Sequence, residues 1–218
     1  MKQNSYLALL DHDFIKIRHP LSGKEVKLHR IIATKSFHIP KYDLHIDNYT
    51  IGGYVQSIEN LDPDNPVWVG NRARVFDNAK IINDSYVSDQ AIVYGDAEIN
   101  GSRIEHHARI YDKARVLGSH VTDLATIKGN VVVEESNIHN AALLFENAYV
   151  GFSTISNGSS VRGNCKLSKC KLSDIAQCNG DAVLTNCVLS NGGAVNGGEH
   201  FNSTIANDIV LKEIRGTD

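Results

Sequence analysis

From Val87 onward the sequence repeats itself every 17 residues for about a hundred residues, and this period constrains the fold more than any other feature. Each repeat carries three aliphatic positions, which form three columns when the repeats are aligned. The columns are Val87, Ile104, Val121, Ile138, Ile155, Leu172 and Leu189; then Val93, Ile110, Ile127, Leu144, Val161, Cys178 and Val195; and then Ile99, Val116, Val133, Val150, Leu167 and Leu184. A short fixed period of this kind is typical of a solenoid, in which each repeat packs against its neighbours.

Small residues stand two positions before most of these aliphatic anchors, as Ala108 does before Ile110. Residues two apart lie on the same face of a strand, so each side of the repeat is predicted to be a short strand with one bulky and one small side chain pointing inward. Pairs such as Gly129-Asn130 suit the sharp corners between sides. The sequence therefore predicts an all-β fold, a single-stranded parallel triangular β-helix of about 17 residues per coil.

The repeat divides the chain into three segments. Residues 67–205 are predicted to form about seven to eight coils. Residues 1–66 do not follow the repeat; Phe14 to Arg18 and Glu25 to His29 alternate in character and predict a β-hairpin. Because an open solenoid end exposes unpaired backbone, we expect this segment to cap the first coil. Residues 206–218 are assigned to a C-terminal tail that covers the other end or an outer face.

Serine and cysteine also occupy inward columns. The serine column is Ser85, Ser102, Ser119, Ser136 and Ser153, and we expect its hydroxyls to bond to backbone at the shortest corner. It continues as Cys170 and Cys187, while Cys165 and Cys178 stand in other inward columns. All four cysteines are interpreted as small core residues, with a disulfide between Cys170 and Cys187 as the alternative. No CxxC pair is present, so no metal site is expected.

At Val75-Phe76-Asp77-Asn78-Ala79-Lys80-Ile81 the chain resembles the left-handed parallel β-helix, or hexapeptide-repeat, family. Within that family it resembles the YdcK-like group of bacterial proteins, which carry a Gly-Gly-aromatic element followed by an aromatic residue in the first coil. Gly52-Gly53-Tyr54 and Trp68 match those features here. The resemblance implies a left-handed coil and, because many family members are acyltransferases, an activity as a transferase.

Composition narrows the classes of function. The net charge of −3 gives no electrostatic reason to expect nucleic acid or an anionic membrane surface as a partner. No apolar run approaches the roughly 18 residues that cross a bilayer, and the first ten or so residues lack the features of a signal peptide. These observations favour a protein of the bacterial cytoplasm that does not enter a membrane.

An outward column of aromatic residues needs an explanation, because monomers seldom expose large apolar patches. The candidate surface consists of Phe76, Ile92, Tyr94, Arg109, Tyr111, Leu143 and Phe145. Three interpretations remain open. The N-terminal segment or the C-terminal tail covers the column, or it is the interface of a homo-oligomer (a dimer or trimer), or it binds a ligand or a partner protein.

A polar outward region carries the candidate catalytic residues His106, His107, His120, His139 and Glu105. The family resemblance implies that a histidine acts as the general base that activates an acceptor for attack on acetyl-CoA, with a carboxylate, here Glu105 or Asp123, orienting its ring. The other interpretation is that these are ordinary surface histidines. Two functions follow: a β-helical scaffold or interaction protein that works through its outer faces and self-association, or an acyl-coenzyme A-dependent acetyltransferase.

Overall fold

A computed structural model describes the structure of residues 4–212. The chain falls into two compact units, residues 1–112 (unit 1) and residues 113–218 (unit 2), and each is described by itself. The predicted fold class is confirmed. The chain is an all-β parallel β-solenoid with about 17 residues per turn, three parallel sheets and an N-terminal antiparallel hairpin. It has about 9 turns, which exceeds the prediction of about seven to eight.

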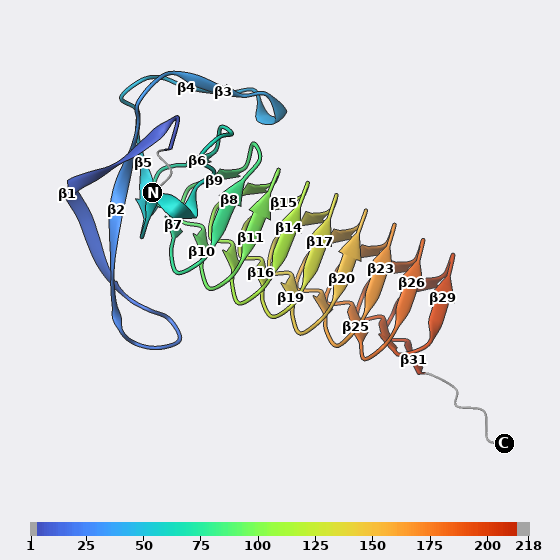
Figure 1. Ribbon diagram of the computed structural model, residues 1–218. Coiled ribbons are helices and arrows are strands. Elements are labelled where there is room, and N and C mark those ends of the chain that lie inside the picture. The colour runs from blue at the N-terminus through green and yellow to red at the C-terminus, as the bar shows by residue number, and fades with distance from the viewer. Residues whose placement is uncertain (1–3, 213–218) are drawn as a thin grey trace. The chain divides into compact units, whose positions relative to one another are not determined.

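Unit 1 opens with antiparallel elements (Figure 1). The hairpin strands are β1 (Leu7–Arg18) and β2 (Glu25–Ala33), and a second, short hairpin consists of β3 (Phe37–Ile39), the 3-10 turn η1 (Pro40–Tyr42) and β4 (Leu44–Ile46). They are followed by β5 (Ile51–Val55) and the 3-10 turn η2 (Ile58–Asn60). Strand β5 pairs antiparallel with β2 on one side and parallel with β7 on the other, so it joins the hairpin to the solenoid.

The solenoid strands of unit 1 belong to three sheets, which we call A, C and D. Sheet A contains β7 (Arg74–Val75), β10 (Ile92–Val93) and β13 (Arg109–Ile110); sheet C contains β8 (Lys80–Ile82) and β11 (Glu98–Asn100); and sheet D contains β6 (Trp68–Val69), β9 (Tyr86–Val87) and β12 (Arg103–Ile104). Within each sheet every strand pairs in parallel with the equivalent strand of the next turn.

Unit 2 continues with the same arrangement (green to red in Figure 1). Its sheet A strands are β16 (Thr126–Ile127), β19 (Leu143–Leu144), β22 (Ser160–Val161), β25 (Gln177–Asn179), β28 (Ala194–Asn196) and β31 (Val210–Lys212). Its sheet C strands are β14 (Arg115–Leu117), β17 (Val132–Glu134), β20 (Tyr149–Gly151), β23 (Lys166–Ser168), β26 (Val183–Thr185) and β29 (Glu199–Phe201). Its sheet D strands are β15 (His120–Val121), β18 (Asn137–Ile138), β21 (Thr154–Ile155), β24 (Lys171–Leu172), β27 (Val188–Leu189) and β30 (Thr204–Ile205).

Strands outside the predicted segment 67–205 also pair in parallel with solenoid strands. At its start Tyr54 and Val55 of β5 already pair in parallel with β7. Gly53 permits this approach, because a Cβ atom there would lie 2.8 Å from the carbonyl oxygen of Ala73. At the other end Leu211 of β31 pairs with Val195, so the predicted tail contributes one more strand. The remainder of that tail, residues 213–218, lies outside the described residues.

The core of each unit is the one that the columns predict. The aliphatic anchors are fully buried, and the small residues two positions earlier are buried beside them, as Ala125 is beside Ile127. Burying a branched aliphatic side chain contributes roughly 1.5–3 kcal/mol, so this row of side chains supplies much of the stability of each turn. Outward positions are therefore the only ones left for function.

The predicted serine ladder is present at the corner between sheets C and D. In unit 2 the Ser136 hydroxyl donates to the carbonyl oxygen of Glu134 at 2.6 Å and accepts the N–H of Ser153 at 3.0 Å. The Ser153 hydroxyl in turn donates to Gly151 and accepts the N–H of Cys170 at 2.9 Å. Each hydroxyl thus satisfies a buried N–H of the next turn and a carbonyl of its own.

All four cysteines are buried free thiols, as the core interpretation predicts. The Cys170 thiol lies 3.2 Å from the carbonyl oxygen of Ser168, and the Cys187 thiol lies 3.4 Å from that of Thr185, so both take the place of a serine in the ladder. Burial raises the pKa of the Cys170 thiol. The alternative disulfide between Cys170 and Cys187 is therefore not formed.

Within residues 4–212 the helical segments are the two short 3-10 turns, and no helix there is long and apolar enough to cross a bilayer.

Candidate functional site

The N-terminal hairpin folds over the outward aromatic column of unit 1. The rings of Phe76 and Tyr94 stack with centroids 5.0 Å apart, and those of Tyr94 and Tyr111 stack at 4.8 Å. Leu28 of β2 packs on Phe76 and Tyr94, and all three are buried; Ile15 and Val26 of the hairpin pack against the same cluster. The hairpin therefore covers a face of the first turns as well as pairing with β5.

The candidate interface residues differ in how far the hairpin covers them. Phe76 and Tyr94 lie under the chain's own hairpin, which is the first of the three interpretations given above. Ile92 and Tyr111 are partly buried against the same cluster, and Arg109 is exposed. In unit 2 Leu143 is 42% exposed.

The last member of the column, Phe145, is half-buried, with the Lys128 ammonium group 5.8 Å from its ring centroid. Both residues lie in unit 2. The column therefore consists of a covered part in unit 1 and an open part in unit 2.

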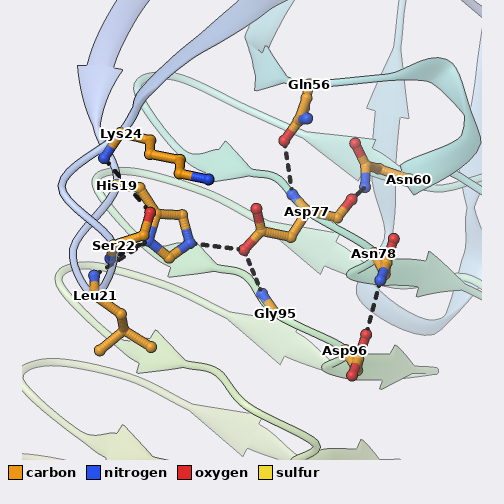
Figure 2. A network of polar contacts seen from close by, with 10 residues as sticks. All are labelled: His19, Leu21, Ser22, Lys24, Gln56, Asn60, Asp77, Asn78, Gly95 and Asp96. Carbon is orange, nitrogen blue, oxygen red and sulfur yellow. Dashed lines mark hydrogen bonds and ion pairs between the residues drawn. The ribbon is translucent and has the colours of Figure 1, made fainter.

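A polar contact fastens the tip of the hairpin to the solenoid (Figure 2). The Nε2 atom of His19 lies 2.9 Å from Oδ2 of Asp77, in the corner after β7. The backbone N–H groups of Leu21 and Ser22 both donate to His19 Nδ1 at 3.1 Å. Because Nδ1 accepts, the proton of the neutral ring is on Nε2, and the ring donates it to the Asp77 carboxylate.

Asp77 is itself held from several sides, as Figure 2 shows. Its Oδ2 atom also accepts the N–H of Gly95 at 3.1 Å, and its backbone N–H donates to the Gln56 side chain at 2.8 Å. The Asn60 amide donates to its carbonyl oxygen at 3.0 Å. The histidine and carboxylate pair is thus a structural latch, and the edge of the His19 ring also meets the ring of Tyr94 at 5.6 Å.

A groove of about 470 Å³ opens beside the hairpin in unit 1. It is lined by Ile15, Arg30, Tyr54, Arg72, Arg74 and Gln90. Strand pairing places Arg30 opposite Tyr54 and Tyr54 opposite Arg74, so these three form one row across β2, β5 and β7. The volume is in the range of small-molecule sites.

The lining of the groove is strongly cationic. None of Arg30, Arg72 and Arg74 forms an ion pair with any residue between 4 and 212. The Arg30 guanidinium lies over the Tyr54 ring at 4.8 Å, which holds its plane in place. Its Nε atom is buried and has no hydrogen-bond partner in the described part of the chain. Guanidinium groups offer forked donors that match carboxylate and phosphate oxygens, so this lining suits an anion.

The carboxylate nearest in sequence to the groove residue Gln90 forms hydrogen bonds with residues that do not line the groove. Asp89 precedes Gln90, and its Oδ1 atom accepts a hydrogen bond from Asn71 at 3.0 Å. Its Oδ2 atom accepts the backbone N–H of His106 at 3.2 Å. These bonds tie Asp89 to the corner of the turn.

The candidate catalytic residues of unit 1 lie at and after the corner that follows β12. Glu105 is 11% exposed and accepts a hydrogen bond from Arg103 at 2.6 Å, and this bond raises the pKa of Arg103. His106 is exposed in a left-handed corner conformation, with φ of 55°. His107 is also exposed. The expected partner carboxylate thus pairs with an arginine.

The other two candidate histidines, His120 and His139, belong to unit 2. His120 is half-buried on β15, opposite Asn137 of β18, and His139 is half-buried just after β18. The two histidines therefore lie on neighbouring turns but not opposite each other.

Sequence reasoning missed the latch and the groove. His19 stands in the loop of the predicted hairpin, 58 residues before Asp77, and nothing in the repeat links them. Arg74 was visible as an outward residue, but Arg30 comes from the aperiodic segment. The sequence signal for the groove was the pair Arg72 and Arg74, two residues apart at the start of the solenoid.

Comparison of the sequence with protein-family models and with curated proteins finds no match.

Proposed function

We propose that the protein is a β-solenoid binding scaffold, and that the groove beside the N-terminal hairpin holds an anionic ligand. The observation that carries this proposal is the convergence of Arg30, Arg72 and Arg74 on one groove without an ion pair within residues 4–212. Three like charges held together repel one another, and an anion between them relieves that repulsion while accepting charge-assisted hydrogen bonds. The hairpin, fixed by its aromatic cluster and latch, supplies one wall.

The test is calorimetric titration of the full chain with inorganic phosphate at low ionic strength. We expect saturable binding, and an affinity reduced about tenfold or more by Arg72→Ala with Arg74→Ala, because each charge-assisted hydrogen bond contributes about 1.5–3 kcal/mol. The matched control is Lys166→Ala with Lys171→Ala, which removes the same charge from exposed strand positions of unit 2. Binding that survives in the arginine variant, or that is lost equally in the control, contradicts the proposal.

Self-association through an outer face is part of the same proposal. The exposed Leu143 and the half-buried Phe145 of unit 2 are members of the candidate surface that remain accessible to a second copy or a partner protein. Light scattering on the eluting protein should give the mass of a dimer or trimer. Leu143→Glu with Phe145→Glu should reduce the mass to that of the monomer. A monomeric mass for the unaltered chain would contradict self-association.

The alternative function is an acetyl-CoA-dependent acetyltransferase with a histidine general base. Glu105, one of the two carboxylates expected to orient the ring, accepts a hydrogen bond from Arg103. Acetyl transfer separates the two functions, because acetyl-CoA carries phosphate groups that an anion-binding groove would also bind. Acetyl transfer that His107→Ala abolishes would support the enzyme.

A further inference from the structure

Two outward rows run from the groove across three successive turns of unit 1. In the first row Arg74 of β7 pairs with Ile92 of β10, and Ile92 pairs with Arg109 of β13. The second row lies two residues earlier along the chain. There the Arg72 N–H donates to the carbonyl of Asp89 at 2.8 Å and the Gln90 N–H to that of His106 at 2.8 Å. In a parallel ladder these bonds align Arg72 with Gln90, and Gln90 with His107.

On these two rows the first and third turns carry basic side chains, and the second turn carries neutral ones. The first turn presents the guanidinium groups of Arg72 and Arg74, with Arg30 beside them. The second turn presents the neutral side chains of Gln90 and Ile92. The third turn presents Arg109 and His107, both exposed. Neighbouring strands are about 4.8 Å apart, so the two cationic positions are about 10 Å apart with a neutral step between them.

From this pattern we infer that the ligand is a small organic molecule carrying two phosphate groups, one at each end of a neutral spacer. The first phosphate lies in the groove against Arg72 and Arg74, and the second lies against Arg109 and His107. This inference rests on the proposed function, because it names the ligand class of the same groove. It also gives His107 a role in binding, because its ring supplies an N–H donor.

Phosphate is favoured over carboxylate at the groove end because of the number of donors present. A phosphate monoester has three terminal oxygens and nearly two negative charges, which match three guanidinium groups better than the two oxygens of one carboxylate do.

The side chains of the second turn indicate the chemistry of the spacer between the two phosphate groups. Gln90 offers an amide that can donate and accept, and the partly buried Ile92 offers apolar surface. The carboxylates of Asp89 and Glu105 border the rows, and both accept hydrogen bonds within unit 1, Asp89 from Asn71 and Glu105 from Arg103. A spacer that is short and uncharged therefore meets complementary groups along its length.

The experiment is calorimetric titration of the full chain with methyl phosphate and with the bisphosphates of ethanediol, butanediol and hexanediol. Joining two anions that bind neighbouring positions turns the second contact into an intramolecular one. We expect butanediol or hexanediol bisphosphate to bind about tenfold or more tightly than methyl phosphate, and ethanediol bisphosphate, which is too short, to bind much like methyl phosphate. His107→Ala with Arg109→Ala should reduce the affinity for the long bisphosphates to that for methyl phosphate, whereas Arg72→Ala with Arg74→Ala should weaken the binding of both kinds of ligand.

The outcomes separate this inference from the proposed function. If every phosphate binds with the same affinity, or if the His107 and Arg109 variant keeps the preference for the long bisphosphates, the two-phosphate ligand is overturned while anion binding in the groove stands. If no phosphate binds, the proposed function and this inference both fail.

Discussion

Nε2 of His19 lies 2.9 Å from Oδ2 of Asp77, and this contact fastens the tip of the N-terminal hairpin to the corner after β7. The two residues are 58 positions apart in the chain. Both backbone N–H groups that donate to Nδ1 belong to the hairpin loop, so the histidine orders the loop and the carboxylate fixes the loop to the turn. The wall of the groove formed by Ile15 depends on this hairpin staying in place.

We expect the latch between His19 and Asp77 to stabilise the hairpin locally. Asp77→Asn weakens a hydrogen bond to a charged acceptor, so we expect amide exchange in residues 14–29 to become about fivefold faster, equivalent to about 1 kcal/mol of local stability. Hydrogen exchange followed by mass spectrometry measures this. Glu25→Gln serves as the control, because it breaks the exposed pair between Lys16 and Glu25 and should leave the exchange rates unaltered. Equal protection in all three proteins would show that the latch contributes nothing.

The covered aromatic cluster predicts alkaline sensitivity. Burial, with the nearby Tyr111 and Asp112, raises the pKa of Tyr94 to about 12. In the unfolded chain a tyrosine ionises near pH 10, so between about pH 10 and 12 the unfolded state binds fewer protons and stability falls as pH rises. Tyr94→Phe should lose less stability between about pH 9 and 11 than the unaltered protein does in urea titrations. Tyr49→Phe, at a ring 74% exposed, should behave like the unaltered protein; identical pH slopes for all three would contradict the assignment.

In the serine ladder, we expect two substitutions of Ser136 to lower the free energy of unfolding by different amounts. Ser136→Ala leaves the N–H of Ser153 without its partner in the core and removes one of the hydrogen bonds to the carbonyl of Glu134, which still accepts the N–H of Phe152, at a cost of about 1–3 kcal/mol. Ser136→Cys should cost less, because Cys170 fills the equivalent position and its thiol lies 3.2 Å from a carbonyl. Urea unfolding of the two variants gives the comparison. A cysteine variant less stable than the alanine variant would mean that volume, not hydrogen bonding, controls this corner.

The fold was predictable because the information for it is local and periodic. Each anchor, such as Ile127, is followed by its counterpart 17 residues later, and the pairing of Thr126 and Ile127 with Leu143 and Leu144 has this register. The corner at Gly129 was also recognisable from its Gly-Asn pair. The structure shows why glycine stands there, because its φ is 85° and a Cβ atom would lie 2.6 Å from the carbonyl oxygen of Glu146. The pairing of β5 and β31 was not predictable in the same way, because the spacing changes there.

The candidate site was far less predictable, because its contacts join aperiodic segments. Arg30 meets Tyr54 and Arg74 only because β2 pairs with β5 and β5 pairs with β7. No column contains these three residues, so the repeat gives no hint of their convergence. Outward side chains are not constrained by packing, and their order along the chain carries little information about which of them gather.

The most direct test of anion binding in the groove is a titration of protein labelled with nitrogen-15 in arginine, followed by the NMR signals of the Nε–H groups as inorganic phosphate is added. The proposal predicts saturable shifts for Arg30, Arg72 and Arg74, with Arg18 and Arg162 unchanged as internal controls. Shifts of equal size at every arginine, or none at the three groove residues, would contradict it.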